Sequence, residues 1–421
     1  MEYGVIGDRL PHSFSKDIHN RCADYEYRVT ELTPDEVAPF MARREFKGIN
    51  VTIPYKQVVI PMLSHVDESA LAIGAVNTVV NRDGELYGYN TDFYGMESLI
   101  RWIGIDLAGK KVLILGTGGT SHTAQAVAKA GGAAAIVVAG RVVDNPHVTY
   151  EQAYEFHTDA QVIINTTPCG MYPYAEGTPE RASTPIDLSR FPHLVGVVDV
   201  VYNPIRTNLV MDAKDRGIPA GGGVYMLVAQ AVKACRIFLD LPTDGMDEQT
   251  EAIYKEIAAE KENIVLVGMP SSGKTTVGKY LAKELGRPLI DTDAEIVKTT
   301  GKEISQIFAE VGEEGFRELE SQVVRNAANE NMGAVIATGG GSILRPENVR
   351  AMKRTGKVYF LDRALEHLLP TDNRPLASSK DAIRQRYQER YDLYRKVCDV
   401  RIAVDESIDH TVQSIRKDFF A

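Results

Sequence analysis

Short apolar runs alternate with amphipathic stretches along the chain, and this alternation is typical of proteins in which helices cover a parallel sheet. Residues 264–267 (IVLV) are apolar throughout, which predicts a strand buried on both faces. A glycine-rich segment follows, and then Val277, Leu281 and Leu285 recur every four residues. This spacing predicts a helix with one apolar stripe against the sheet. We therefore predict an α/β fold.

The glycine-rich segment, residues 268–275 (GMPSSGKT), matches the phosphate-loop pattern GxxxxGK[ST] between a strand and a helix. Its backbone N–H groups and the helix N-terminus would attract an anion. Lys274 would reach the β- and γ-phosphates, and the Thr275 hydroxyl would hold Mg²⁺. The chain is predicted to bind ATP or another nucleoside triphosphate through Gly268, Ser271, Ser272, Gly273, Lys274, Thr275 and Thr276.

A second glycine-rich turn follows residues 111–115 (KVLIL), which predict another buried strand. Its glycines, Gly116, Gly118 and Gly119, open a helix, as in dinucleotide-binding folds, although such a turn alone is weak evidence. The next strand ends at Arg141, where an NAD site would usually carry Asp or Glu for the ribose hydroxyls. Arg141 favours binding of a 2′-phosphate and therefore of NADP(H). The alternative interpretation is that Arg141 is an ordinary surface arginine at a strand end.

The first 95 residues place polar side chains at strand ends and turns. Asn50 and Thr52 alternate on one predicted strand, and Lys56 is expected to open the next helix. Asn77 and Asp92 follow at later strand ends or turns. Each residue alone could simply bond its own backbone or face solvent. Together they suit a polyhydroxylated, anionic small molecule.

Seven motifs between residues 12 and 230 resemble, in order and spacing, those of shikimate dehydrogenases. They are HSFS (12–15), NVTIPYK (50–56), AVNT (75–78), YNTD (89–92), INTTPCGM (164–171), DVVYNP (199–204) and GGGVYMLVAQ (221–230). The resemblance implies NADPH-dependent reduction of 3-dehydroshikimate to shikimate, with Lys56 and Asp92 as the catalytic pair. It implies substrate contacts from Ser13, Ser15, Asn50, Thr52, Asn77, Tyr202 and Gln230, and places Met226 at the cofactor.

The C-terminal motifs resemble those of shikimate kinases: DTD (291–293), GEEGFRELE (312–320), TGGG (338–341), RPL (374–376) and ERYDLY (389–394). We expect the carboxylates of Asp291 and Asp293 to project to one side of a strand. By the resemblance, Asp293 binds the shikimate hydroxyls and aids deprotonation, and Asp291 and Thr275 place Mg²⁺. Arg317 and Arg390 would clamp the substrate carboxylate, since forked guanidinium donors match that group. Arg374 would cover the phosphates, and the pocket would be lined by Gly339, Gly340 and Gly341.

At 421 residues the chain is too long for one ordinary core. We predict a two-lobed dehydrogenase, with a substrate lobe at 1–95 completed by about 225–258 and a Rossmann-like NADP lobe at 96–224. A P-loop kinase domain with a parallel sheet follows at 262–421. Residues 246–261 are charged and helix-forming, so we expect a flexible linker of only a few residues near 260–263.

Charge and cysteine content narrow the partners and the compartment. A net charge of −10 argues against a nucleic-acid surface. The four cysteines form no CxxC pair, which indicates a reducing cytoplasm, and no apolar run is long enough for export or a membrane span. A homo-oligomer is compatible with the sequence.

The two halves read as consecutive enzymes, because the product of the first is the substrate of the second. A regulator that senses shikimate or quinate without turnover is an alternative, against which the intact Lys56, Asp92, Lys274 and Asp293 argue. Another is a quinate-type dehydrogenase that uses NAD in the N-terminal half. Arg141 argues against that reading.

Overall fold

The structure is a computed structural model of residues 1–421, and it describes all of them except 9, 11–13, 142–145, 173–183, 371–378 and 405–406. The chain divides into two compact units, Met1–Ile257 and Ala258–Ala421. Helix α9 (Met246–Lys261) runs directly into strand β13 (Asn263–Val267), with only Glu262 between them. The expected linker near 260–263 thus corresponds to a single residue between two regular elements, and its flexibility stays a prediction. Among the residues that the structure describes, no helix has the length and apolar character needed to cross a membrane.

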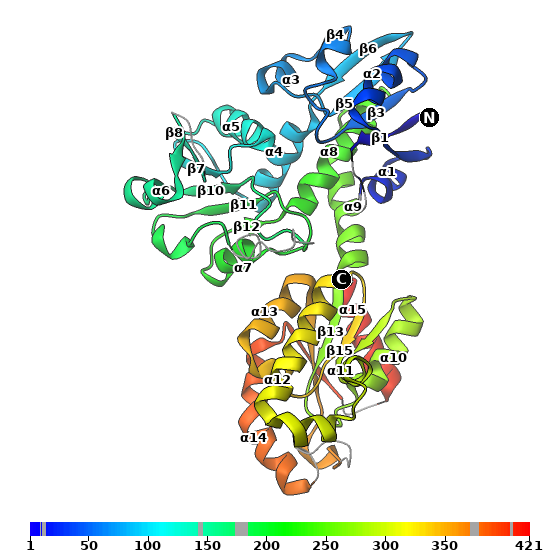
Figure 1. Cartoon of the computed structure of the whole chain (residues 1–421), viewed down its shortest axis with the longest axis vertical. Helices are drawn as coiled ribbons and strands as arrows, with labels where there is room; N and C mark the ends of the chain where they lie inside the picture. Colours follow the sequence, from blue (N-terminus) through cyan, green and yellow to red (C-terminus); the bar gives the residue numbers. More distant parts are fainter. Residues whose placement is uncertain (9, 11–13, 142–145, 173–183, 371–378, 405–406) are drawn as a thin grey trace. The chain divides into compact units, whose positions relative to one another are not determined.

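The first sheet of the N-terminal unit has the order β2-β1-β3-β5-β6-β4 (Figure 1). Strand β1 pairs in parallel with β2 and β3, and β5 is antiparallel to β3 and β6. Asp83 and Gly84 join β5 to β6 with φ of 52° and 88°, the left-handed pair that a tight hairpin requires. The elements are β1 (Tyr3–Gly7), α1 (Ser15–Cys22), β2 (Tyr27–Glu31), α2 (Pro34–Arg43), β3 (Gly48–Val51), η1 (Ile60–Met62), β4 (His65–Val66), α3 (Glu68–Ile73), β5 (Thr78–Arg82) and β6 (Glu85–Tyr89).

The second sheet of this unit is parallel throughout, in the order β12-β11-β10-β7-β8-β9. Its central strands are apolar on both faces because helices cover each side. The elements are α4 (Thr91–Ile103), β7 (Lys111–Leu115), α5 (Gly119–Ala130), β8 (Ala135–Gly140), β9 (Val148–Thr149), α6 (Tyr150–Phe156), β10 (Val162–Asn165), η3 (Leu188–Arg190), β11 (Gly196–Asp199), α7 (Asn208–Asp215), β12 (Ala220–Gly221) and α8 (Gly223–Phe238).

Helices α4 and α8 connect the two lobes of the N-terminal unit. They cross closely at Gly95, where an added Cβ would lie 2.7 Å from the Met226 carbonyl oxygen. Met226 joins the core of the second lobe, whereas Val228 packs with α1 and Phe238 packs with the first sheet. Helix α8 therefore packs into the cores of both lobes and links them.

The C-terminal unit is a three-layer sandwich whose parallel sheet has the order β14-β15-β13-β16-β17 (Figure 1). Alternate residues of β13 point to opposite faces: Leu266 packs with α10 and α15, and Val265 packs with α12, α13 and α14. Helix α12 is kinked at Gly312. The elements are β13, α10 (Lys274–Leu285), β14 (Leu289–Asp291), α11 (Thr292–Thr300), α12 (Ile304–Glu330), β15 (Val335–Ala337), η4 (Ser342–Leu344), α13 (Pro346–Thr355), β16 (Gly356–Asp362), η5 (Leu365–His367), α14 (Lys380–Val397), β17 (Val400–Ala403) and α15 (Ile408–Phe419).

Candidate active sites

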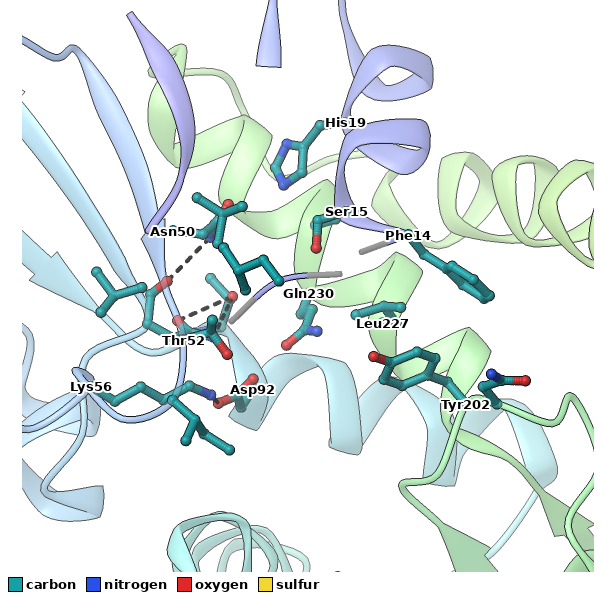
Figure 2. Close-up of a pocket in the computed structure, with 18 of the residues that line it drawn as sticks. Phe14, Ser15, His19, Asn50, Thr52, Lys56, Asp92, Tyr202, Leu227 and Gln230 are labelled. Carbon is teal, nitrogen blue, oxygen red and sulfur yellow. Dashed lines mark hydrogen bonds and ion pairs between the residues drawn. The ribbon is translucent and has the colours of Figure 1, made fainter. Parts of the chain in front are cut away.

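A cavity of about 700 Å³ lies in the N-terminal unit where the first sheet meets helices α1, α4 and α8. Figure 2 shows Lys56 and Asp92 pointing toward one another on one side of it, with Tyr202 and Leu227 in another part of the wall. The predicted residues that line it are Ser15, Asn50, Thr52, Lys56, Asn77, Asp92, Tyr202 and Gln230. Chain segments as far apart in the sequence as Ser15 and Gln230 thus meet around one space. Ser13 lies outside the described residues.

Lys56 and Asp92 form an ion pair in this wall, with Lys56 Nζ 2.6 Å from Asp92 Oδ2. The expected helix at Lys56 is wrong, because residues 53–59 form turns and the next helical element is η1. Asp92 lies in the first turn of α4, where the helix N-terminus favours a negative charge. Asn90 caps this turn by accepting hydrogen bonds from the backbone N–H groups of Asp92 and Phe93. The fold thus holds the Asp92 carboxylate in place, and this carboxylate positions the Lys56 ammonium group.

The amide side chains around the cavity differ in how far the protein satisfies them. Asn77 accepts from the Thr91 backbone N–H at 2.8 Å and donates to the Thr91 hydroxyl at 3.1 Å. Asn50 donates to Thr78 Oγ1 at 3.0 Å and accepts from the Tyr27 hydroxyl at 2.7 Å. By contrast, Gln230 Oε1 is buried with no partner among the described residues. A buried oxygen in that state costs roughly 1–3 kcal/mol, so the cavity fits a ligand that donates a hydrogen bond there.

Sequence reasoning missed His19, which lies one helical turn after Ser15 on α1 and also lines the cavity. Its ring stacks on Tyr27 with centroids 4.0 Å apart, and Nδ1 lies 2.6 Å from the Tyr25 hydroxyl. Burial lowers the pKa of His19 to about 3, although a hydrogen bond with Asn50 opposes this shift. His19 is therefore neutral at physiological pH. The sequence signal that could have identified His19 was its spacing of four residues from Ser15, which places both side chains on one face of a helix.

The cofactor side of the N-terminal unit carries the predicted glycine turn. Gly116 follows β7 with φ of 104°, and an added Cβ would lie 2.9 Å from Thr166 Oγ1. Gly118 and Gly119 begin α5, and added Cβ atoms there would meet nothing within 4 Å, which leaves the helix N-terminus open to an anion. Arg141 is exposed directly after β8. These features fit a dinucleotide phosphate group. Met226, which was also predicted at the cofactor, is buried.

A buried carboxylate supports the segment that carries Tyr202. Asp199 accepts from Thr207 Oγ1 at 2.6 Å, from Asn165 Nδ2 at 2.9 Å and from the Val201 backbone N–H at 3.1 Å. Burial raises the pKa of Asp199 to about 6, and the three donors oppose this shift. The network ties the ends of β10 and β11 to α7 beside the cavity.

The phosphate loop lies at the carboxyl end of β13, the central strand of the C-terminal sheet. Lys274 Nζ donates to the Gly268 and Met269 carbonyl oxygens at 2.8 and 2.9 Å. Gly273 takes φ of 97°, which directs the loop into α10. Ser271, Gly273, Lys274, Thr275 and Thr276 line a cavity of about 990 Å³. Gly268 and Ser272 lie outside that lining, with Ser272 fully buried.

The two carboxylates of the DTD motif do not share a strand face, which corrects the expectation from their spacing. Asp291 ends β14 and caps α11, where it accepts from the Asp293 and Ala294 backbone N–H groups. Its Oδ2 accepts from Thr275 Oγ1 at 2.6 Å, so a hydroxyl and a carboxylate stand together as oxygen ligands would for Mg²⁺. Asp293 lies in the first turn of α11 and lines the cavity beside the phosphate loop.

The glycine turn after β15 packs against two buried arginines. An added Cβ at Gly341 would lie 1.9 Å from Arg317 Nη1, and Arg390 Nη1 donates to the Gly340 carbonyl oxygen at 3.1 Å. Arg317 Nη1 donates to Glu320 Oε2 at 2.5 Å, while its buried Nε has no partner among the described residues. Gly339 lies close to the carboxylates of Asp293 and Glu320. An added Cβ at Gly339 would lie 2.7 Å from Asp293 Oδ1 and 2.5 Å from Glu320 Oε1.

Burial lowers the pKa of Arg390, with nearby Arg317 adding to this effect, and raises the pKa of Glu320, which Arg317 opposes. Two buried guanidiniums that pack against a glycine turn are suited to a carboxylate ligand. Sequence reasoning missed Glu320, although it ends the GEEGFRELE motif. Arg374 lies outside the described residues.

The fold and the two sites define a chain with two enzyme units, a two-lobed dinucleotide-dependent dehydrogenase and a P-loop kinase. Sequence models of the shikimate dehydrogenase substrate binding domain and of shikimate kinase match residues 5–79 and 270–419. The shikimate dehydrogenase (NADP(+)) of Clostridium perfringens (strain SM101 / Type A) is 34% identical over 273 residues, which covers 61% of this chain and 97% of that protein. The chain belongs to the shikimate dehydrogenase family and carries a shikimate kinase domain at its C-terminal end.

Two solved structures are similar to the N-terminal part of the chain. Shikimate dehydrogenase 1 from Peptoclostridium difficile has a TM-score of 0.53 at 31% identity and covers 61% of this chain and 98% of its own. Quinate dehydrogenase from Corynebacterium glutamicum, solved in complex with NAD, has a TM-score of 0.52 at 27% identity and covers 60% of this chain and 99% of its own. The predicted α/β class and the combination of an oxidoreductase with a kinase are confirmed. Because both dehydrogenases fit almost equally well, the fold alone does not decide the substrate or the cofactor.

Proposed function

We propose that the N-terminal unit reduces 3-dehydroshikimate to shikimate with NADPH, and that the C-terminal unit phosphorylates shikimate with ATP and Mg²⁺. The observation that carries the first step is the Lys56–Asp92 pair in a cavity that also presents an unpartnered Gln230 oxygen. A substrate rich in hydroxyl groups would donate to that oxygen and exchange hydrogen bonds with Ser15 and Thr52.

In the first reaction NADPH supplies a hydride to the ring ketone, and the oxygen then needs a proton. Lys56 is the proton donor in our proposal, because its ammonium lies in the cavity wall and is held by Asp92 at 2.6 Å. Asp92 orients Lys56 through this ion pair. Positioned proton transfer of this kind contributes about 10²–10⁴-fold to a rate.

The preference for NADPH rests on Arg141, which follows β8 where a ribose-binding carboxylate would stand in an NAD site. An exposed guanidinium at this position suits a 2′-phosphate. We expect kcat/KM with NADPH to exceed that with NADH, and Arg141→Ala to reduce this difference through the KM for NADPH. Equal use of the two cofactors by the unaltered chain would favour the quinate-type alternative.

In the second reaction ATP supplies the γ-phosphoryl group, and the protein contributes positioning and charge neutralisation. Lys274 would exchange its two loop carbonyl partners for phosphate oxygens, and Thr275 with Asp291 would hold Mg²⁺ and its water ligands. Asp293 would bind the attacking hydroxyl and accept its proton. Arg317 and Arg390 would bind the shikimate carboxylate beside Gly341. We further infer a cytoplasmic location, because all four cysteines are free thiols, including the neighbouring Cys22 and Cys235.

One incubation tests both steps. The purified chain is mixed with 3-dehydroshikimate, NADPH and Mg-ATP, while NADPH absorbance and the mass of phosphorylated product are followed. We expect both signals, and the phosphorylated product should require all three reagents. NADPH consumption without phosphorylated product would refute the kinase half. Absence of both signals with shikimate still bound would instead support the sensing regulator.

A further inference from the structure

Arg363 lies in the wall of the cavity beside the phosphate loop, and none of the roles described above uses it. It directly follows β16, which pairs in parallel with β13 so that Phe360 stands opposite Val267. Gly268 also approaches β16, since an added Cβ there would lie 2.8 Å from the Leu361 carbonyl oxygen. Because the carboxyl ends of parallel strands meet at one edge, Arg363 and the phosphate loop open onto the same space.

The guanidinium of Arg363 has unused hydrogen-bonding capacity. Within the part of the chain that the structure describes, its buried Nε has no hydrogen-bond partner and no carboxylate pairs with the side chain. The neighbouring Asp362 is committed elsewhere: it accepts from Arg401 Nε at 2.5 Å and from the Tyr391 hydroxyl at 3.1 Å. A buried N–H of a cation without an acceptor is costly, and binding an anion in the cavity would remove that cost.

The wall that carries Arg363 is fixed to the phosphate loop. Ser271 Oγ donates to the Leu369 carbonyl oxygen at 2.7 Å, which ties the loop to the segment after β16. Pro370 lines the same cavity beside Ser271, Thr275 and Arg363. A triphosphate held by the loop would therefore lie within the space that Arg363 faces.

We propose that the Arg363 guanidinium binds phosphate oxygens of the nucleotide in the kinase unit, with its forked donors supplying Nε–H and an Nη–H. This inference rests on the proposed ATP site but not on turnover of shikimate. Lys298 lines the same cavity and is the matched control, because it is already paired with Glu295 and its side chain is 75% exposed.

The test is calorimetric titration of the full chain with ADP and, separately, with inorganic tripolyphosphate, at saturating NADP to occupy the first unit. Arg363→Ala should weaken both ligands by about 10- to 100-fold, the loss expected for a charge-assisted hydrogen bond. Arg363→Lys should recover part of the affinity, and Lys298→Ala should change it less than about twofold, as for an exposed charge. Tripolyphosphate isolates the phosphate contact from any contact to the base.

Three results would overturn the proposal. One is unchanged affinity of Arg363→Ala for both ligands. A second is weaker ADP binding with unchanged tripolyphosphate binding, because the contact would then be to the nucleoside. A third is equal loss in the Lys298→Ala variant, since the effect would then be the general field of the cavity. If the unaltered chain binds both ligands but phosphorylates no shikimate, the kinase proposal fails while this inference stands.

Discussion

The substitution Gly341→Ala tests whether the glycine turn of the kinase unit holds Arg317 in place. Gly341 has φ of −103°, which any residue adopts, so the change adds a methyl group without backbone strain. The new Cβ would lie 1.9 Å from Arg317 Nη1, 2.3 Å from Cζ and 2.5 Å from Nη2. Ordinary contacts of this kind need about 3.5 Å, so the guanidinium would have to move by roughly 1.5 Å.

Such a movement breaks the 2.5 Å hydrogen bond from Arg317 Nη1 to Glu320 Oε2 and withdraws the guanidinium from Gly341. A hydrogen bond to a charged group is worth about 1.5–3 kcal/mol. If the displaced guanidinium also loses its proposed hydrogen bond to the shikimate carboxylate, the KM for shikimate should rise roughly 10- to 100-fold, at about 1.4 kcal/mol for each factor of ten. The KM for ATP should change little, because the three atoms nearest to the new methyl group all belong to Arg317.

The assay measures kinase rates with each substrate varied in turn, and the dehydrogenase rate of the same sample reports intact protein. The double variant Gly341→Ala with Arg317→Ala provides the control, because the clash is absent once the guanidinium is removed. The methyl group should then change the KM for shikimate by less than about twofold. An unchanged KM in the single variant, or fully additive losses in the double variant, would refute the reasoning.

Three further changes probe the N-terminal unit. Lys56→Met should lower kcat for 3-dehydroshikimate reduction by about 10²–10⁴-fold with a nearly unchanged KM, and a normal kcat in steady-state kinetics would exclude Lys56 as the proton donor. Gly116→Ala combines φ of 104° with a Cβ 2.9 Å from Thr166 Oγ1, so titration should show weaker NADPH binding while kinase rates stay constant; equal affinity would contradict this. Thr207→Val removes a donor from Asp199, whose pKa burial raises from 3.8 to about 6. Ionisation of Asp199 already destabilises the folded state as pH rises from 3.8 to about 6. Loss of the Thr207 donor should therefore lower the free energy of unfolding, measured by chemical denaturation, by about 1–3 kcal/mol, and by more at pH 8 than at pH 5. A loss that is independent of pH would refute this reasoning.

Several features could be read from local sequence because their physical cause is local. The phosphate loop follows from glycine spacing, a lysine and a following helix, and the structure places Lys274, Thr275 and Asp291 around it. The apolar stripe of Val277 and Leu281 is buried against the sheet as predicted, since a period of four residues defines one helical face.

The sequence was less informative where a side chain's role depends on distant partners. Spacing put Lys56 at the start of a helix and the two DTD carboxylates on one strand face, and both expectations were wrong because turns and a helix cap replaced regular strand geometry. The unpartnered state of Gln230 depends on what packs around α8, not on its neighbours in the chain.

By itself, the sequence determined the class of both enzyme units and predicted candidate residues for their chemistry, because phosphate loops, glycine turns and clustered polar motifs act through backbone geometry over a few residues. Only the tertiary structure decided which charges are paired and which are free to bind a ligand. Glu320 pairs with Arg317 and Asp362 pairs with Arg401, whereas Arg363 lines a cavity and its Nε has no partner among the described residues. Electrostatic pairing and burial depend on residues that folding brings together from distant parts of the chain, and local patterns cannot encode them.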